Sequence, residues 1–319
     1  MFIRTVIALL MCACSLAAEE SKDRVTVLAV VGAGGEEEYQ KEFEHAAAQW
    51  EQAAGRAEAQ LISIGRGAGT NDLQHLEEAL SSLSTEGAEP LWLVLLGHGT
   101  FDGKEAKFNL RGPDLSSAQL AKWLDPFRRP VVIINAASAS APFLNALSRS
   151  NRVIISATRS GYEQNFARFA KYLAGAIADP RCDLDKDGQT SLLEAFLRGA
   201  RETADWYKGE GRLATEHALL DDNADGLGTQ ADWFRGVRAV KKPDKGSSVD
   251  GVRAHQFHLV RNDAEKRLPA EVRTRRDELE LAIARLREAK PGMKEEEYYR
   301  QLEPLLVDMA RLYESAPEQ

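Results

Sequence analysis

The sequence has few cysteines, no excess of positive charge and few long apolar segments. Three of its 319 residues are cysteine, and 41 lysines and arginines stand against 49 aspartates and glutamates, a formal net charge of −8. This acidic balance creates no field that would attract nucleic acid or an anionic membrane. Apart from a short stretch at the N-terminus, no apolar segment approaches the length of a membrane-spanning helix. We therefore expect neither nucleic-acid binding nor a transmembrane segment.

The signatures of nucleotide binding are incomplete. Residues 31–35 (VGAGG) lack the third glycine of a dinucleotide fingerprint, and three glutamates follow them. Residues 65–69 (GRGAG) lack the Lys-Ser/Thr ending of a phosphate-binding loop. Both glycine clusters are predicted to be turns.

The N-terminus has the pattern of a secretory signal. Arg4 precedes an apolar stretch over residues 6–14, and small residues follow at 15–18. We expect residues 1–18 to be a signal peptide and the protein to be exported, either periplasmic or secreted. Cleavage before Glu19 leaves Cys182 as the one remaining cysteine, which excludes an internal disulfide. A lipoprotein anchored through Cys14 is the alternative.

Residues 22–178 are predicted to form an α/β domain. Apolar segments rich in β-branched side chains alternate with segments of helical spacing. The expected strands are 24–31, 60–64, 91–96, 106–110, 130–134 and 152–157. The expected helices are 36–53, 71–83, 116–124, 142–147 and 162–177. This alternation implies right-handed crossovers and a mainly parallel sheet flanked by helices.

The composition changes after residue 178. Residues 179–236 contain two acidic, glycine-containing loops, either part of the α/β domain or packed on it. Residues 237–255 are polar and typical of a linker. Residues 256–319 are expected to form a helical hairpin broken at Pro291-Gly292, because apolar residues recur at helical spacing on both sides of the break. This hairpin is a candidate surface for forming an oligomer.

Two of the apolar segments lead to residues that could carry chemistry. Residues 91–96 lead to His98-Gly99, and residues 130–134 lead to Ser138. The carboxyl ends of neighbouring parallel strands meet at one edge of a sheet, where open α/β sheets assemble their sites. A histidine and an alcohol in these positions are typical of a hydrolytic site.

These residues resemble the caspase-like cysteine peptidases, a superfamily that also includes the legumain-like peptidases and the gingipains. In that family the catalytic histidine is followed by glycine, and the nucleophile lies in an Ala-Cys-any-Ser-Gly type of turn. The matching run here is residues 137–141 (ASASA), with Ser138 in the place of the cysteine. A different register places Ala137 there and leaves no nucleophile. The resemblance covers about residues 24–177.

The resemblance implies a role for each matching residue. His98 would be the general acid and base, Ser138 the acyl acceptor, and the backbone N–H groups of Gly99 and Ser138 the oxyanion hole. Thr158 and Arg159, just past the next strand, would lie near the substrate side chain. The substrate or ligand would be a peptide or a protein.

Serine in place of cysteine changes the chemistry. A cysteine beside histidine ionises near neutral pH, whereas a serine hydroxyl needs its proton removed by a histidine that a carboxylate orients. Asp102 is near His98 in the sequence, but the sequence does not place it against the imidazole. We therefore expect a catalytically impaired or silent domain. The alternatives are an active hydrolase that uses Ser138 with His98, and an interaction protein that acts through the C-terminal hairpin.

The first acidic loop resembles an EF-hand or dockerin-like calcium loop at every ligand position. Gly188 supplies the sharp turn at position six. The predicted ligands are Asp183, Asp185, Asp187, the Gln189 carbonyl, Ser191 and Glu194. Hard cations need many oxygen ligands, and this spacing wraps them around one point, so calcium is the expected cofactor.

The second loop has the same pattern with a weaker ending. Its predicted ligands are Asp221, Asn223, Asp225, Leu227, Thr229 and Asp232. Aspartate at position twelve is shorter than glutamate, so we expect weaker binding here. Because an exported protein meets calcium constantly, a structural role is expected rather than a switch.

Three further histidines receive no catalytic role. His217 lies in a segment of helical pattern and is expected to be solvated or to cap a helix. His255 and His258 could face one way on a helix, but the sequence offers no third ligand, so a zinc site is not predicted.

Overall fold

The structure is a computed structural model that describes residues 23–244 and 248–314. The predicted signal segment 1–18, with Cys12 and Cys14, lies outside the described residues. The N-terminal cleavage and the lipoprotein alternative therefore stay predictions.

A seven-stranded, mostly parallel sheet forms the centre of the molecule, in the order β10-β9-β8-β7-β3-β1-β2. Its parallel strands are β1 (Thr26–Val31), β2 (Gln60–Ile64), β3 (Leu91–Leu96), β7 (Val131–Asn135) and β8 (Arg152–Ser156). Towards one edge of the sheet, β9 (Leu219–Asp221) pairs antiparallel with β8 and with the edge strand β10 (Thr229–Gln230). This sheet confirms the predicted α/β fold class.

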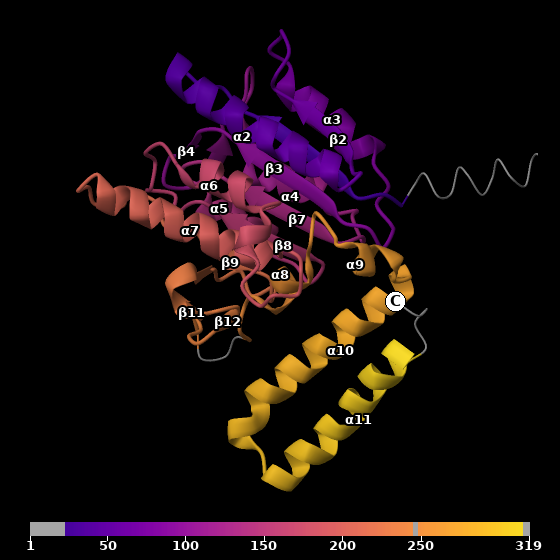
Figure 1. Cartoon of the computed structure of the whole chain (residues 1–319). Helices are drawn as coiled ribbons and strands as arrows, with labels where there is room; N and C mark the ends of the chain where they lie inside the picture. Colours follow the sequence, from indigo (N-terminus) through magenta and orange to yellow (C-terminus); the bar gives the residue numbers. More distant parts are fainter. Residues whose placement is uncertain (1–22, 245–247, 315–319) are drawn as a thin grey trace, which may run out of the picture.

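Helices cover both faces of the sheet because each central strand is apolar on both sides. In β1, Val27 and Val31 face one buried cluster, and Leu28 and Val30 face the other. The first cluster lies under α2 (Glu37–Arg56), α6 (Phe169–Ala176) and α7 (Leu192–Gly209). The second lies under α3 (Asp72–Ser82), α4 (Ser117–Trp123) and α5 (Ala141–Leu147). Figure 1 shows the sheet between these helices.

Two small sheets accompany the central one. The strands β4 (Gly99–Phe101), β5 (Ala106–Phe108) and β6 (Leu115–Ser116) form an antiparallel sheet that begins directly after His98. The strands β11 (Phe234–Arg235) and β12 (Arg238–Ala239) form a hairpin. The predicted edge strand at 106–110 is therefore β5, and it belongs to a separate sheet.

The helix predicted over residues 162–177 begins later than expected. The helix in this segment is α6, which begins at Phe169. The carboxylate of Glu216 accepts the backbone N–H groups of Arg168 and Phe169 and so caps the N-terminus of the helix at this point. The segment that carries Glu216 and His217 is not helical, which corrects the expected helix around His217. The His217 imidazole instead lies 2.6 Å from Glu163.

The predicted linker 237–255 is partly folded onto the body. It contains β12 and most of α8 (Val252–Gln256), and Asp250 and Ala254 are buried. Ala254 packs against the first core cluster, so the end of this segment is part of the folded body. Short helices complete the region: η1 (Pro180–Cys182), η2 (Ala231–Trp233) and α9 (Asp263–Arg267).

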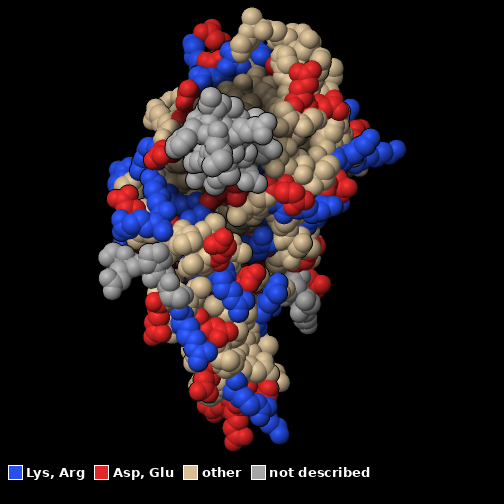
Figure 2. Space-filling view, turned by 90° about the vertical axis from the view of Figure 1, so that its right-hand side faces the viewer, with Lys and Arg blue, Asp and Glu red and all other residues tan. Residues whose placement is uncertain are grey.

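The C-terminal hairpin consists of α10 (Ala270–Ala289), η3 (Lys290–Gly292) and α11 (Glu295–Glu314). The two long helices lie side by side and extend away from the α/β body (Figure 1). Pro304 lies inside α11. No helix among the described residues is both long and apolar enough to cross a bilayer. On the face drawn in Figure 2, basic and acidic residues are interspersed over the body and the hairpin.

Candidate functional site

The structure brings the predicted strand ends together. Strands β3 and β7 pair in register from Leu91 with Val131, and β8 pairs with β7 on its other side. His98, Ser138 and Thr158 therefore all follow neighbouring strands at one edge of the sheet, as the sequence predicts.

Ser138 is closed against Gly99. Its side-chain Oγ accepts the Gly99 backbone N–H at 3.0 Å and donates to the Gly99 carbonyl at 3.1 Å. The residue is only 1% exposed. A Cβ at position 99 would lie 2.2 Å from the Ser138 carbonyl oxygen, so only glycine permits this close approach. The Gly99 N–H, a predicted oxyanion donor, is thus already bonded to the serine.

His98 faces a different part of the molecule. Its Nε2 lies 3.2 Å from the Gly34 carbonyl, which can only accept, so Nε2 carries the proton of the neutral ring. The ring packs edge-on against Tyr39, Phe43 and Phe166, with centroids 5.1–6.0 Å away. Burial among these rings lowers the pKa of His98, and the bond to Gly34 opposes that shift only in part. No His98–Ser138 hydrogen bond is present among the described residues.

The carboxylate expected nearest His98 is used elsewhere. Asp102 Oδ1 accepts the backbone N–H groups of Lys104 and Glu105 in the turn between β4 and β5. Among the described residues no carboxylate bonds to the His98 ring, so the histidine–carboxylate pair that a serine nucleophile needs is not formed there.

The two residues predicted to lie near a substrate differ in their exposure to solvent. Thr158 is fully buried, and its Oγ1 accepts the backbone N–H groups of Ser140 and Ala141 at the start of α5. It offers no exposed atom to a substrate. Arg159 is half-exposed and pairs with Glu163 at 3.2 Å.

The first acidic loop has a closed network of internal hydrogen bonds. The Asp183 carboxylate accepts the N–H groups of Lys186 and Gly188, at positions four and six. Asp185 accepts from Asp187, and Asp187 accepts from Gln189. Carboxylate oxygens of Asp183, Asp185 and Asp187 all lie within 4.8 Å of one another. The carboxylates at positions one, three and five therefore converge on one point.

The residues at positions nine and twelve of this loop, Ser191 and Glu194, form hydrogen bonds at the start of α7. Ser191 caps α7 by accepting the Glu194 N–H, and Glu194 Oε2 accepts the Ser191 N–H. Glu194 Oε1 also accepts the Leu184 N–H at 2.5 Å, which turns the carboxylate towards the loop. The capping box that starts the helix thus also positions the last predicted ligand.

The second loop repeats the hydrogen-bond network position by position. Asp221 accepts from Ala224 and Gly226, the fourth and sixth residues. Asn223 accepts from Asp225, which accepts from Leu227. In both loops the residues at positions four and six have positive φ, between 67° and 86°. Two loops of different sequence thus adopt one backbone geometry.

The end of the second loop is different. Thr229 belongs to β10, and its hydroxyl donates to the Asp250 carboxylate at 2.6 Å. Asp232 lies in the short helix η2, so no long helix follows this loop. The last predicted ligand of the second loop is therefore not followed by a long helix as Glu194 is in the first loop.

Two buried carboxylates beside the second loop were not predicted from the sequence. Asp222 accepts the N–H groups of Gly251 and Ala254, and Asp250 accepts the Asp222 N–H. Burial, with the repulsion between the two charges, raises the pKa of Asp250 to about 9. The pair fastens α8 to the loop, and no local sequence pattern marks Asp250 as its partner.

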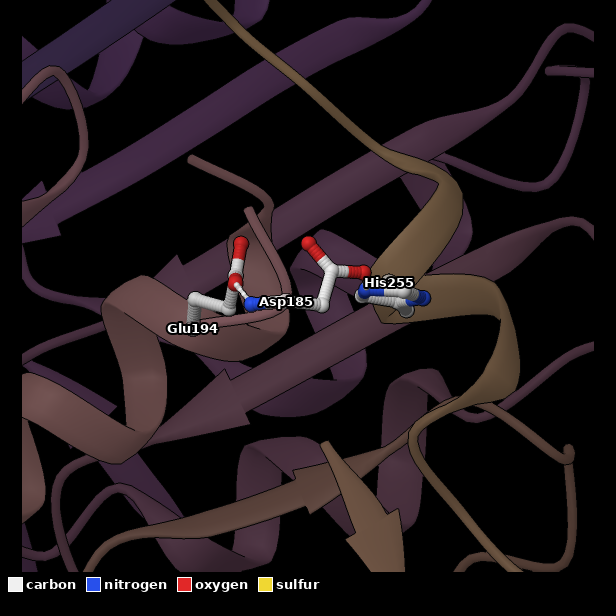
Figure 3. Close-up of side chains that lie close together, drawn as sticks. All are labelled: Asp185, Glu194 and His255. Atoms are coloured by element: carbon white, nitrogen blue, oxygen red, sulfur yellow. Dashed lines mark hydrogen bonds and ion pairs between the residues drawn. The ribbon is translucent and has the colours of Figure 1, made fainter. Parts of the chain in front are cut away.

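Two histidines that received no role from the sequence lie against the first loop. His255 Nε2 is 3.0 Å from Asp185 Oδ2, and His258 Nε2 is 3.8 Å from Asp187 Oδ2. Figure 3 shows the Asp185 carboxylate between Glu194 and His255. Side-chain atoms of Asp185, Glu194 and His255 lie within 4.8 Å of one another, although Asp185 and His255 are 70 residues apart and only the fold brings them together.

Comparison with known proteins finds distant structural matches. No protein-family model and no curated protein matches the sequence. The Drosophila initiator caspase Dronc aligns with a TM-score of 0.44 and 13% identity over 66% of this chain and 82% of its own. Protein GSU0716 from Geobacter sulfurreducens aligns with a TM-score of 0.39 and 12% identity over 62% of this chain and 92% of its own. Likeness at this distance does not establish a shared activity.

Proposed function

We propose that this protein is a calcium-binding protein with a catalytically silent, caspase-like domain that serves as a binding module for a peptide or protein. The observation that carries the proposal is the closure of Ser138 Oγ on both backbone groups of Gly99. A nucleophile must lose its proton to a base and attack an exposed carbonyl carbon. Ser138 is buried and bonds no base among the described residues.

The oxyanion site supports the same conclusion. Removing one preorganised donor from such a site costs about a hundredfold to a thousandfold in turnover. The Gly99 N–H is the donor that the family resemblance assigns, and here it serves the serine. A substrate oxygen would have to displace that internal bond. Acyl transfer would therefore need both His98 and Ser138 to move.

A fluorophosphonate probe tests the proposal on the folded full chain. We expect no labelling above that of Ser138→Ala, with an active serine hydrolase in the same mixture as a positive control. Labelling mapped to Ser138 by peptide mass spectrometry would overturn the silent state and favour the active hydrolase. Peptide binding can then be compared between wild type and Ser138→Ala, which should bind equally if the serine is not a nucleophile.

The calcium part of the proposal is supported by the shared network of the two loops. The donor set is carboxylate, carbonyl and hydroxyl oxygen, which suits calcium better than a softer ion. When bound, the ion would supply the positive charge that holds these oxygens together. In the first loop its ligands would run from Asp183, the first in the sequence, to Glu194, the last.

Isothermal titration of the full chain tests calcium binding. We expect two binding events. Asp225→Asn should weaken the weaker one and Asp187→Asn the tighter one, because the amide keeps one oxygen ligand but loses the negative charge. These positions are chosen because neither side chain is fully buried, so each variant should still fold. Asp205→Asn, on the exposed side of α7, is the matched control and should retain both events. Absence of calcium binding in wild type would remove this part of the proposal.

Export is proposed on the same grounds. An oxygen-lined loop whose geometry is held by calcium is useful where calcium is constantly present. Cell fractionation of the expressed full chain, with mass spectrometry of the mature N-terminus, tests export and would separate cleavage before Glu19 from a lipid-modified Cys14. The interaction role of the C-terminal hairpin stays a prediction.

A further inference from the structure

The two acidic loops differ in what faces them. The second loop is faced by side-chain oxygens, since the Gly226 N–H donates to Ser148 Oγ and the Thr229 hydroxyl donates to the Asp250 carboxylate. The first loop is faced by the imidazoles of His255 and His258, which come from α8 and the residues after it. Loops with one backbone geometry therefore have different surroundings.

Three potential ligands converge from three parts of the chain. Asp185 comes from the loop, Glu194 from the first turn of α7, and His255 from α8. One ligand atom of each lies within 4.8 Å of the other two. Each carboxylate also accepts backbone N–H groups, but a carboxylate has about four lone-pair positions and keeps some of them for an ion.

A second observation comes from His258. Its side chain is only 9% exposed, and its Nε2 has no hydrogen-bond partner among the described residues. It faces Asp187 at 3.8 Å, which is too long for a hydrogen bond. A buried imidazole nitrogen normally finds a partner, so its presence beside the loop points to a ligand there.

The donor chemistry distinguishes this cluster from a pure calcium site. Imidazole suits zinc and other first-row transition ions, whereas calcium takes oxygen. Two carboxylates and one imidazole, with a further position left for water, is a donor set found at zinc sites. A zinc ion bound at about 2.0–2.2 Å needs its donors within about 4 Å of one another. The three ligand atoms lie within 4.8 Å of one another, so zinc binding would require them to move closer by up to about 1 Å.

We propose that Asp185, Glu194 and His255 form a binding site for a first-row transition ion of the zinc class, which shares two ligands with the first calcium loop. Zinc and calcium would then exclude each other from the first loop and bind independently at the second. The proposal rests on the proposed function only in taking the first loop as a cation site.

Full-chain protein titrated with Zn²⁺ by calorimetry, and with Co²⁺ as a visible-absorbing substitute, tests the site. We expect His255→Gln to weaken both ions at least tenfold, because glutamine can keep the hydrogen bond to Asp185 but cannot supply the imidazole. His75→Gln, on the exposed face of α3, is the matched control and should bind like wild type. Equal affinities in the two variants would overturn the proposal.

Competition provides the second readout. Saturating calcium should raise the apparent Kd of Co²⁺ at least tenfold in wild type, and equally in Asp225→Asn, whose change lies in the second loop. Where calorimetry shows that calcium occupies the first loop, unaltered Co²⁺ binding in calcium would overturn the shared-ligand site. If calcium fails to bind at all while Zn²⁺ binding still depends on His255, the calcium proposal fails and this one stands. If calcium binds both loops and Zn²⁺ binding ignores His255, this proposal fails alone.

Discussion

At the scale of single residues, the contact between Gly99 and Ser138 shows how a catalytic pattern can become a structural one. The serine satisfies a backbone donor and a backbone acceptor in a buried place, where either would be costly if left unpaired. Glycine is needed because the Ser138 carbonyl passes so close to position 99. Hydrogen bonding to the backbone of Gly99 is enough to explain why position 138 carries a hydroxyl, and no role in hydrolysis is needed.

Ser138→Ala should therefore lower stability. We expect a loss of about 1–3 kcal/mol in the free energy of unfolding, since the Gly99 N–H and carbonyl lose their partner in a buried site. Urea unfolding followed by far-UV circular dichroism measures it. Ser81→Ala, on the exposed side of α3, is the control and should change stability by less than about 0.5 kcal/mol. Unchanged stability in Ser138→Ala would mean that the serine is held less firmly than the hydrogen bonds indicate.

The pKa of His98 gives a second prediction at this scale. Burial lowers it, so the folded protein holds the neutral ring at a pH where the unfolded chain is already protonated. The unfolded state then binds more protons, and the contribution of His98 to stability is lost as the pH falls through about 6.5 towards the folded pKa. An NMR titration of the ring, assigned with His98→Gln, should give a pKa below 6.5. A value above it would contradict the aromatic enclosure.

Sequence reasoning located the site residues but not their partners. The periodicity of apolar residues is enough to place His98 and Ser138 at adjacent strand ends, because strand order follows from short crossovers. Whether Ser138 Oγ turns towards His98 or towards Gly99 depends on a separation of a few ångströms between two loops. No local pattern encodes that separation.

At the scale of elements, the start of α7 was predictable and the start of α6 was not. Ser191 and Glu194 form a capping box that is visible three residues apart in the sequence. The cap of α6 is Glu216, which is 47 residues beyond Phe169. A helix whose first turn is fixed by a distant carboxylate has no local signal for its boundary. The segment that carries Glu216 also carries His217, and it is not helical. The expected start of the helix over residues 162–177 and the expected helix around His217 were therefore both wrong.

The base of the C-terminal hairpin gives the prediction for this scale. Glu89 accepts hydrogen bonds from Arg261 and Arg273, and all three side chains are at most 22% exposed. Glu89→Gln leaves two largely buried guanidinium groups without their carboxylate, so we expect a loss of about 2 kcal/mol and faster amide exchange in the first turns of α10. Hydrogen exchange and urea unfolding measure these effects.

The control for this ion pair is an exposed one. Lys41 and Glu37 on α2 pair at 2.5 Å, but their side chains are 70% and 83% exposed. Glu37→Gln should cost no more than about 0.5 kcal/mol, because water and salt screen such a pair. Equal losses in Glu37→Gln and Glu89→Gln would mean that the hairpin base is as solvated as the helix surface.

At the scale of the whole molecule, the two acidic loops join segments that the sheet alone does not hold. The first loop lies between the end of α6 and the start of α7, and the side chain of Asn262, just before α9, donates to its Asp187 carbonyl. The second loop joins the two antiparallel edge strands and, through Asp222 and Asp250, holds α8. Ions bound in both loops would therefore stabilise the sheet edge and the path to the hairpin as one unit.

Calcium should consequently raise the stability of the whole chain rather than of the loops alone. At a calcium concentration one hundred times the Kd of one site, the gain is about 2.7 kcal/mol for that site, because the ion binds the folded state and not the unfolded one. We expect the Tm to fall when EDTA is added, and amide exchange to quicken in α8 and α9 as well as in the loops. The variant carrying both Asp187→Asn and Asp225→Asn should have a Tm that a given calcium concentration raises less than in wild type, because both sites lose a charged ligand, while Asp205→Asn should respond like wild type. A Tm of the wild-type chain that is the same in calcium and in EDTA would contradict a structural role for the loops, and protection confined to the loops would contradict their connection to the rest of the molecule.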